Sequence, residues 1–433
     1  MATRMSDSRV YRHLWTAPEL DVLFDEPQRI GCWLGILKAL AAAQAQAGLI
    51  PSAAAAAIED LDAGALDLDF VAERTRATAH STLGLIDGLR RLLPDDVHRY
   101  VYYGATVQDL TDTWFGIVMR DVGRLVAARL VQLRQTLLGV AVEHRGTVMA
   151  GRTHGQPGAP VTFGFKAAGW ADEASRHLAR LAEGDARWST GQLAGAVGTL
   201  SFFGADALAI RSDFCRRLGL GVPAVSWLTS RDRVAEFGHT LAMVCAFLAR
   251  IGGEVYELQR PEIGELREPR APGGVSSITM PHKRNPEASE HLATLARLVR
   301  GQSNILLEAM DQQHERDGRG WKSEWIALPE VCELTVVAVN LALPVVTGLE
   351  IDPARMRANL ALGSEYLLVR LAERVGKHRA QALLQDALLA RSGFSQRIAS
   401  EVDGVSPEEV DGWLATVELG TAEAQIDAVL ATP

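Results

Sequence analysis

The sequence has few of the residues that mark a disulfide scaffold, a metal site or a nucleic-acid surface. Its four cysteines are scattered and contain no C-x-x-C pair, so we expect neither a disulfide framework nor a zinc site but four buried thiols. They are Cys32, Cys215, Cys245 and Cys332. The net charge of −9 leaves no basic surplus for neutralising phosphates, so no nucleic-acid partner is expected. A local cationic pocket could still bind a small anion.

The signals of export and membrane insertion are also missing. The N-terminal run Met-Ala-Thr-Arg-Met-Ser lacks the apolar stretch of a signal peptide. We expect no apolar run to reach the length that spans a bilayer, and therefore no membrane partner. These features predict a cytoplasmic protein.

Residues that favour strands are sparse, and aromatic residues make up only 6% of the chain. Ala and Leu, which favour helix, are plentiful, so we predict an all-α fold. Apolar residues recur at steps of three and four in two long stretches, which places them on one face of each helix. The two sets are Val122, Val126, Leu130, Leu133, Leu137 and Val140, and Phe237, Leu241, Val244, Leu248, Ile251 and Val255. A third helical stretch is expected over 286–329, and a fourth begins near Pro329.

Several long apolar helices predict a central bundle of more than four helices. Helices this apolar commonly continue their packing into other subunits, which predicts an oligomer; a large helical monomer is the alternative. We divide the chain into an N-terminal helical domain at 1–104, a central long-helix bundle at 105–350 and a C-terminal helical domain at 351–433.

The loop at 271–286 is the strongest functional signal. Two glycines and three prolines within it exclude a regular element, and a long irregular connection between helices is often functional. Ser277 follows the glycines, whereas Lys283 and Asn285 lie in the stiffer, proline-bounded half. A hydroxyl on a mobile arm beside a fixed cation suits chemistry on an anion. A plain surface loop is the competing interpretation.

Two further segments share this character. Residues 151–164 place His154 among small residues at a break between helical stretches, although a lone histidine is usually structural. Residues 103–113 are rich in hydroxyls and carboxylates just before a long helix, where a capped helix N-terminus is the plain interpretation.

These three segments, in this chain order, resemble the three conserved regions of the fumarase/aspartase superfamily of lyases. The loop is similar to the signature Gly-Ser-Ser-x-Met-Pro-x-Lys-x-Asn-Pro, with Ser277 six residues before Lys283, although Ser276 stands in place of the glycine and Ile278 in place of the second serine. The resemblance covers essentially the whole chain. It implies a homotetrameric core, active sites that draw their three segments from three subunits, and no metal or other cofactor.

The resemblance also implies catalytic roles. Ser277 corresponds to the base, whose alkoxide the loop's backbone N–H groups would stabilise. Lys283 and the Asn285 amide would hold the substrate carboxylate that gains charge as an aci-carboxylate forms. His154 corresponds to the histidine that protonates the leaving group, and Glu290 to the carboxylate that orients this histidine. Further substrate contacts implied in the same way are Thr106, Thr153, Gln156, Ser276, Met280 and His80.

Two branches of the superfamily are nearest, adenylosuccinate lyase and 3-carboxy-cis,cis-muconate cycloisomerase. The first normally has Arg-Tyr where this chain has Leu14-Trp15, and a Ser-rich segment where this chain has 318–325. Both changes remove partners of a nucleotide phosphate, and tryptophan cannot replace the arginine contact. The second branch fits residues 227–233 and Trp321 better.

The sequence therefore predicts a lyase that performs β-elimination on a small dicarboxylate, a substituted succinate. It would release fumarate and a leaving group that contains nitrogen, such as an amine or the nitrite of nitrosuccinate. 3-Carboxy-cis,cis-muconate cycloisomerase is the alternative, followed by adenylosuccinate lyase and a catalytically silent structural homologue. Retention of the implied catalytic residues favours an enzyme over a silent scaffold.

Overall fold

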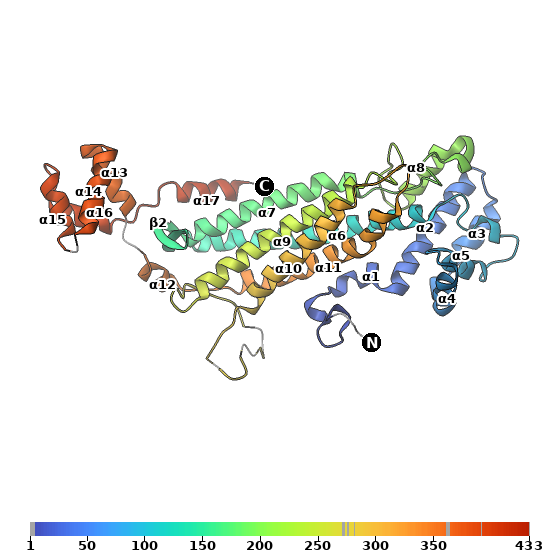
Figure 1. The fold of residues 1–433 in the computed structure, drawn as a ribbon, viewed down its shortest axis with the longest axis horizontal. Coiled ribbons are helices and arrows are strands. Elements are labelled where there is room, and N and C mark those ends of the chain that lie inside the picture. Colours follow the sequence, from blue (N-terminus) through green and yellow to red (C-terminus); the bar gives the residue numbers. More distant parts are fainter. Residues whose placement is uncertain are drawn as a thin grey trace. The chain divides into compact units, whose positions relative to one another are not determined.

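The computed structural model describes residues 5–270, 273–274, 277–280, 282–360, 364–390 and 392–432. Within these residues the chain forms helices α1–α17 and two small antiparallel sheets (Figure 1). The prediction of an all-α fold is confirmed, although the sequence pattern gave no sign of the β-hairpin at residues 148–162. Unit 1 consists of the described parts of Met1–Leu130, His177–Ala249 and His291–Leu341, and unit 2 of those of Val131–Arg176, Arg250–Glu290 and Ala342–Pro433. The three-domain division stays a prediction.

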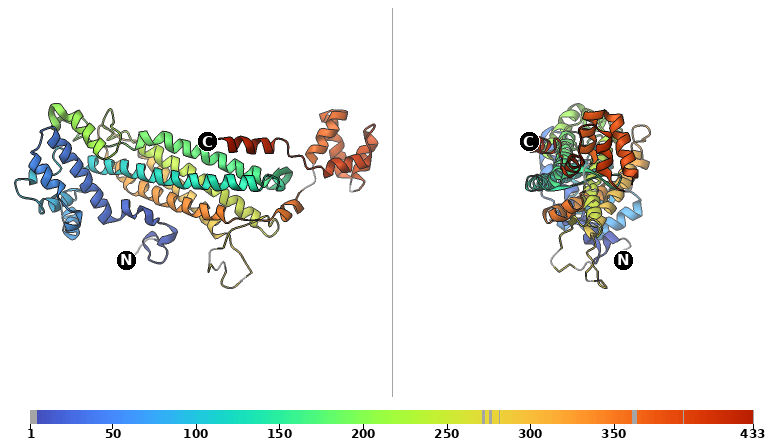
Figure 2. Two further views of the ribbon diagram at one scale, coloured as in Figure 1. Left: turned by 180° about the vertical axis from the view of Figure 1, so that it is seen from behind. Right: turned by 90° about the vertical axis from the view of Figure 1, so that its left-hand side faces the viewer.

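Unit 1 begins with a group of helices that, apart from α2, are short. They are α1 (Asp21–Phe24), α2 (Glu26–Gln46), α3 (Ser52–Glu59), α4 (Leu68–Thr78) and α5 (Leu83–Arg90), and α8 (Ala207–Arg217) comes later in the chain. Helices α2–α5 and α8 lie together in both Figure 1 and Figure 2. Helix α5 approaches α4 at Gly84, where a Cβ atom would lie 2.4 Å from the Val71 carbonyl oxygen. Glycine is therefore needed there for the two helices to pack.

Five long helices supply residues to both units. They are α6 (Val107–Glu143), α7 (Phe163–Trp188), α9 (Asp232–Gln259), α10 (Glu287–Glu308) and α11 (Gly318–Thr347). The predicted apolar rhythm is confirmed in α6 and α9, where the side chains of both predicted sets are buried, apart from the half-buried Val140. In unit 1, Trp188 of α7 packs edge-on against Phe237 of α9, with ring centroids 5.3 Å apart. Burial of such faces provides most of the stability of the helices.

Helix α11 continues through Pro329, where we predicted a boundary. The break lies instead at residues 309–317, between α10 and α11. A proline inside a helix removes one backbone hydrogen bond and usually kinks or ends the helix. Here Ala327, Leu328 and Val331 around it are fully buried, so tertiary packing outweighs this local cost.

Three of the long helices could cross a membrane by length and composition. These are α6, α9 and α11, so the expectation that no apolar run reaches that length is wrong. In α9 and α11, 67% and 61% of the most apolar window is buried inside the protein itself. Packing within the protein thus accounts for most of their apolar surface. In α6 the buried share is 28%, which leaves much of this stretch uncovered in the single chain.

Unit 2 combines two small sheets with short helices. Strands β1 (Val148–Thr153) and β2 (Gln156–Thr162) form a hairpin, and β3 (Leu266–Arg267) pairs with β4 (Glu350–Ile351). The helices are α12 (Pro353–Ala358), α13 (Ser364–Val375), α14 (Lys377–Leu389), α15 (Phe394–Glu401), α16 (Pro407–Ala415) and α17 (Ala422–Ala431). Helices α13–α16 enclose a small apolar core of their own that includes Leu367, Leu371, Ile398 and Val410. Helix α17 is tied to the segment just after α6 by ion pairs from Arg145 to Glu423 and Asp427.

Candidate functional site

His154 lies at the tip of the β1–β2 hairpin. The strands pair up to Thr153 with Gln156, so His154 and Gly155 form a two-residue turn. Both turn residues have positive φ, 54° and 75°, as a type I′ turn requires. Thr153, His154 and Gln156 are all exposed in the single chain. This turn therefore brings three of the predicted site residues together on an open surface.

A buried ion pair holds the base of this turn. Arg152 Nη2 lies 2.6 Å from Glu265 Oε1, and Nη1 lies 2.9 Å from Oε2. The Glu265 side chain is fully buried and also accepts a hydrogen bond from Asn359 Nδ2 at 2.8 Å. Such a two-point contact fixes the orientation of the guanidinium as well as its position. Sequence reasoning missed this pair, because 113 residues separate its members.

Ser277 begins a compact turn in the signature loop. Its Oγ accepts a hydrogen bond from the Met280 backbone N–H at 3.1 Å, and the Lys283 N–H donates to the Met280 carbonyl at 2.9 Å. Ser277 is half-buried, whereas Met280 and Lys283 are exposed. Ser276, which we also predicted as a site residue, lies outside the described residues.

The end of the loop is anchored next to α10. Arg284 donates to both Glu350 carboxylate oxygens, at 2.7 and 2.8 Å, and to the Glu268 carbonyl at 2.7 Å. The Glu268 carboxylate accepts the backbone N–H groups of Ala288 and Ser289 in the first turn of α10. Negative charge at a helix N-terminus is stabilising. These contacts hold the stiff half of the loop.

The remaining residues of this segment lie at the start of α10. Asn285 is half-buried and donates from Nδ2 to Glu287 Oε1 at 3.1 Å. Glu290 belongs to the first turn and is exposed. Among the described residues of unit 2, no hydrogen bond or ion pair joins the side chain of His154 to that of Ser277 or Lys283. The single chain thus groups the loop residues with one another and the hairpin residues with one another.

Thr106 and His80 lie in unit 1, within one polar patch. Arg316 Nη1 donates to Thr106 Oγ1 at 2.6 Å. The side chains of Thr82 and Thr106 lie near the Tyr102 phenol, and burial raises the pKa of this phenol. His80 Nδ1 accepts a hydrogen bond from the Thr82 backbone N–H at 3.4 Å. The backbone of Tyr102 has a positive φ of 61°. We call His80, Thr82, Tyr102, Thr106 and Arg316 the unit 1 patch.

Asp109 fixes the backbone of this patch. Its carboxylate is buried and accepts three backbone N–H groups, from Ala194 at 2.7 Å, Thr106 at 2.9 Å and Gly195 at 3.1 Å. Burial raises the pKa of Asp109 to about 7, because the three donors only partly offset the loss of water. Thr106 is therefore tied to the loop at residues 194–195.

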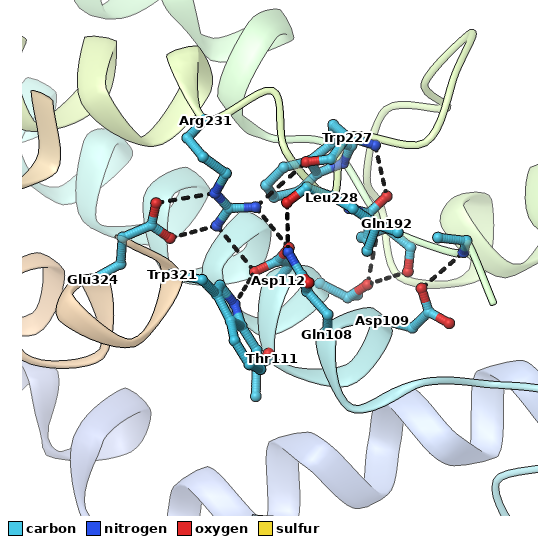
Figure 3. Close-up of polar contacts among 12 residues, drawn as sticks. Gln108, Asp109, Thr111, Asp112, Gln192, Trp227, Leu228, Arg231, Trp321 and Glu324 are labelled. Carbon is cyan, nitrogen blue, oxygen red and sulfur yellow. Dashed lines mark hydrogen bonds and ion pairs between the residues drawn. The ribbon is translucent and has the colours of Figure 1, made fainter. Parts of the chain in front are cut away.

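A buried charge network lies one turn further along α6 (Figure 3). Arg231 Nη1 lies 2.7 Å from Asp112 Oδ2, and Arg231 Nε lies 2.9 Å from Glu324 Oε1. All three side chains are fully buried. Trp321 Nε1 donates to Asp112 Oδ1 at 3.0 Å. The network joins α6 to the start of α9 and to α11. A sequence signal for it existed, since residues 227–233 and Trp321 fit the cycloisomerase branch.

The described residues include no cluster of side chains suited to hold a metal. No three His, Cys, Asp or Glu side chains gather there as metal ligands would. The four cysteines are free; the expectation of buried thiols is confirmed for Cys215, Cys245 and Cys332 but is wrong for Cys32, which is half-buried. Burial raises the pKa of Cys245 to about 12, so this thiol is a poor ligand and a poor nucleophile.

Comparisons with known proteins agree with the fold and the motifs. A protein-family model described as a lyase matches residues 12–301. N-acetyl-S-(2-succino)cysteine lyase of Dickeya dadantii is 34% identical over 99% of this chain and 98% of its own. 3-Carboxy-cis,cis-muconate cycloisomerase of Pseudomonas putida is 36% identical over 95% of this chain and 99% of its own. The crystal structure of a fumarate lyase from Mesorhizobium sp. BNC1 matches with a TM-score of 0.85 and 30% identity, covering 97% of this chain and 99% of that one.

Proposed function

We propose a substrate and a mechanism for this chain, which belongs to the fumarase/aspartase superfamily of lyases. The chain performs β-elimination on a substituted succinate and releases fumarate. The reaction removes a proton next to one carboxylate and expels the group on the neighbouring carbon. An aci-carboxylate forms between the two steps, and the protein must stabilise its second negative charge.

The turn at Ser277 carries this proposal. A serine hydroxyl is a weak base unless its alkoxide is stabilised, and the Met280 N–H already donates to Ser277 Oγ at 3.1 Å. A backbone donor aimed at that oxygen favours the alkoxide, as an oxyanion hole does. Lys283 follows within the same turn. Its ammonium has no ion-pair partner among the described residues, which leaves it available for a substrate carboxylate.

The other predicted residues complete the mechanism. The Asn285 amide assists Lys283 in holding the aci-carboxylate, and His154, oriented by Glu290, gives its proton to the leaving group. Thr153 and Gln156 flank His154 on the same turn and hold substrate. Ser276 and Met280 contact substrate from the loop, and Thr106 and His80 do so from the unit 1 patch.

These segments meet in an oligomer. His154 and Lys283 are exposed in the single chain, where water would surround substrate. Much of the apolar stretch of α6 is also uncovered. A homotetramer in the cytoplasm, in which three subunits share each site, would bury this surface and close the site.

We favour a sulfur-linked leaving group over the nitrogen-containing group expected from the sequence. The Dickeya dadantii relative, which matches nearly the full length of both chains, is named for a succinylated thiol. A thiolate also departs more readily than an amine, because its conjugate acid has a pKa of about 8.5. The Pseudomonas putida relative supports the cycloisomerase as the second candidate.

A substrate panel tests this function. Purified oligomer is offered N-acetyl-S-(2-succino)cysteine, nitrosuccinate, N-substituted aspartates, 3-carboxy-cis,cis-muconate and adenylosuccinate. Fumarate is followed by ultraviolet absorbance and free thiol by a chromogenic reagent, with the Ser277→Ala variant as the blank. We expect equimolar fumarate and thiol from the first compound and no AMP from the last. A lactone from the muconate with no fumarate from any succinate would establish the cycloisomerase instead, and inactivity towards the whole panel would contradict both.

A further inference from the structure

The unit 1 patch contains Arg316, a cation to which the proposed mechanism assigns no role. Arg316 is half-buried, and among the described residues it has no carboxylate partner. The adjacent Asp317 pairs with Arg319, and Glu315 on its other side is exposed. Within the described part of the chain, the guanidinium of Arg316 forms one hydrogen bond, to the neutral Thr106 hydroxyl. Its remaining N–H donors are available to an anion.

The position of this guanidinium is well defined. It lies over the Trp321 ring, 6.0 Å from the ring centroid, and donates to Thr106 at 2.6 Å. Trp321 is held by its hydrogen bond to Asp112, which is itself paired with the buried Arg231. Asp109 fixes the backbone of Thr106 from the other side. A cation held in place by a buried network loses little freedom when it binds a ligand.

We propose that Arg316, with the Thr106 hydroxyl, binds a third carboxylate that the leaving group carries. This inference rests on the proposed elimination, in which Lys283 and Asn285 serve the succinyl part from a different segment of the chain. A planar guanidinium beside a hydroxyl donor matches a carboxylate in geometry and charge. The named substrates of both relatives fit: N-acetyl-S-(2-succino)cysteine and 3-carboxy-cis,cis-muconate each contain three carboxyl groups.

The site therefore selects tricarboxylates over dicarboxylates. An amine or nitrite leaving group carries no carboxylate to pair with Arg316, whereas a mercapto acid does. Arg316 is then a specificity-determining residue, because it contacts the part of the substrate that distinguishes one superfamily member from another.

Paired substrates test the assignment. The kcat/KM ratio of S-(2-succino)mercaptoacetate to S-(2-succino)mercaptoethanol is measured in the wild-type oligomer and in Arg316→Gln, Arg316→Lys and Arg319→Gln. We expect the wild type to prefer the mercaptoacetate compound, and Arg316→Gln to lower the ratio by about 10- to 100-fold, mainly through KM. Arg316→Lys restores part of the ratio, and Arg319→Gln, on the exposed neighbour, keeps it. An equal loss for both substrates, or an undiminished ratio, would overturn the proposal.

A binding measurement separates this proposal from the proposed reaction. Calorimetric titration with tricarballylate and with succinate requires no turnover. Arg316→Gln is expected to weaken tricarballylate binding by about 10- to 100-fold relative to succinate. If the wild type binds tricarballylate no better than succinate, the third-carboxylate site is refuted even if fumarate is released. Selective binding without fumarate release would refute the elimination alone.

Discussion

Arg231 and Asp112 form an ion pair that is completely removed from solvent, with Arg231 Nη1 2.7 Å from Asp112 Oδ2. Burial of two charges is costly, and the cost is repaid only when geometry and additional hydrogen bonds are good. Here Glu324 and the Trp321 indole supply those additional contacts. Through these two contacts the network also joins the segment that carries Thr106 to the segment that carries Arg316. Stability and substrate recognition thus depend on the same buried charges.

Replacing Asp112 with Asn should destabilise the protein by about 3–5 kcal/mol, because Arg231 loses a buried counter-charge. The matched control is Glu373→Gln, which breaks the exposed pair with Arg370 and should cost less than about 1 kcal/mol. Urea denaturation followed by circular dichroism compares the two variants. Equal midpoints for both would contradict the importance of the buried pair.

The contact between Arg152 and Glu265 should govern turnover through the hairpin. Arg152→Lys keeps the charge but loses the two-point contact, so kcat should fall by about 10- to 100-fold as the His154 turn shifts. Arg250→Gln, at an exposed arginine that pairs with the half-buried Glu173 in the same unit, serves as the control. The thermal midpoint of Arg152→Lys is expected to stay close to that of the wild type. Full activity in Arg152→Lys would show that the pair does not position the turn.

Ser277→Ala should lower kcat by about 10²- to 10⁴-fold, because it removes the proposed base, the hydroxyl that accepts the Met280 N–H bond. Thr279→Ala removes a neighbouring exposed hydroxyl from the same loop and should retain turnover. Inhibition by succinate, measured for both variants, checks that binding persists. If kcat fell equally in the two variants, the cause would be a general disturbance of the loop, and Ser277 would not be the base.

Glu333 should make stability depend on pH. Burial, helped by the nearby Asp21, raises its pKa from 4.5 to about 7 against the opposing effects of the Ala17 N–H and Arg12. Between these two values the folded protein holds a proton that the unfolded chain releases. The free energy of unfolding should therefore fall as pH rises from about 4.5 to about 7, by at most about 3 kcal/mol. Denaturation across this window should show a flatter profile for Glu333→Gln than for Glu373→Gln, and identical profiles would exclude Glu333 as the source.

The sequence allowed the parts with a local signal to be predicted. Steps of three and four between Val122 and Leu137 mark one buried helix face, and the irregular loop around Ser277 could be located by its glycines and prolines. The continuation of α11 through Pro329 could not, because packing there outweighs a local preference. Nor could the partners of Arg152 and Arg231, which lie 113 and 119 residues away. Pairing between distant segments leaves no periodic trace in the chain. The proposed role of Arg316 rests on its contact with Thr106. The sequence alone does not distinguish this arginine from the others.

The positive φ of His154 restricts which residues this position can accept. A φ of 54° is strained for most residues but mild for Asn, Asp, His and Gly. Position 154 therefore has to satisfy the geometry of a tight reversal and the chemistry of an imidazole at once. In a saturation library, Asn and Gly should preserve the hairpin while abolishing proton delivery, whereas Val and Ile should disrupt both. Very few replacements at position 154 can therefore abolish catalysis and still leave the fold intact.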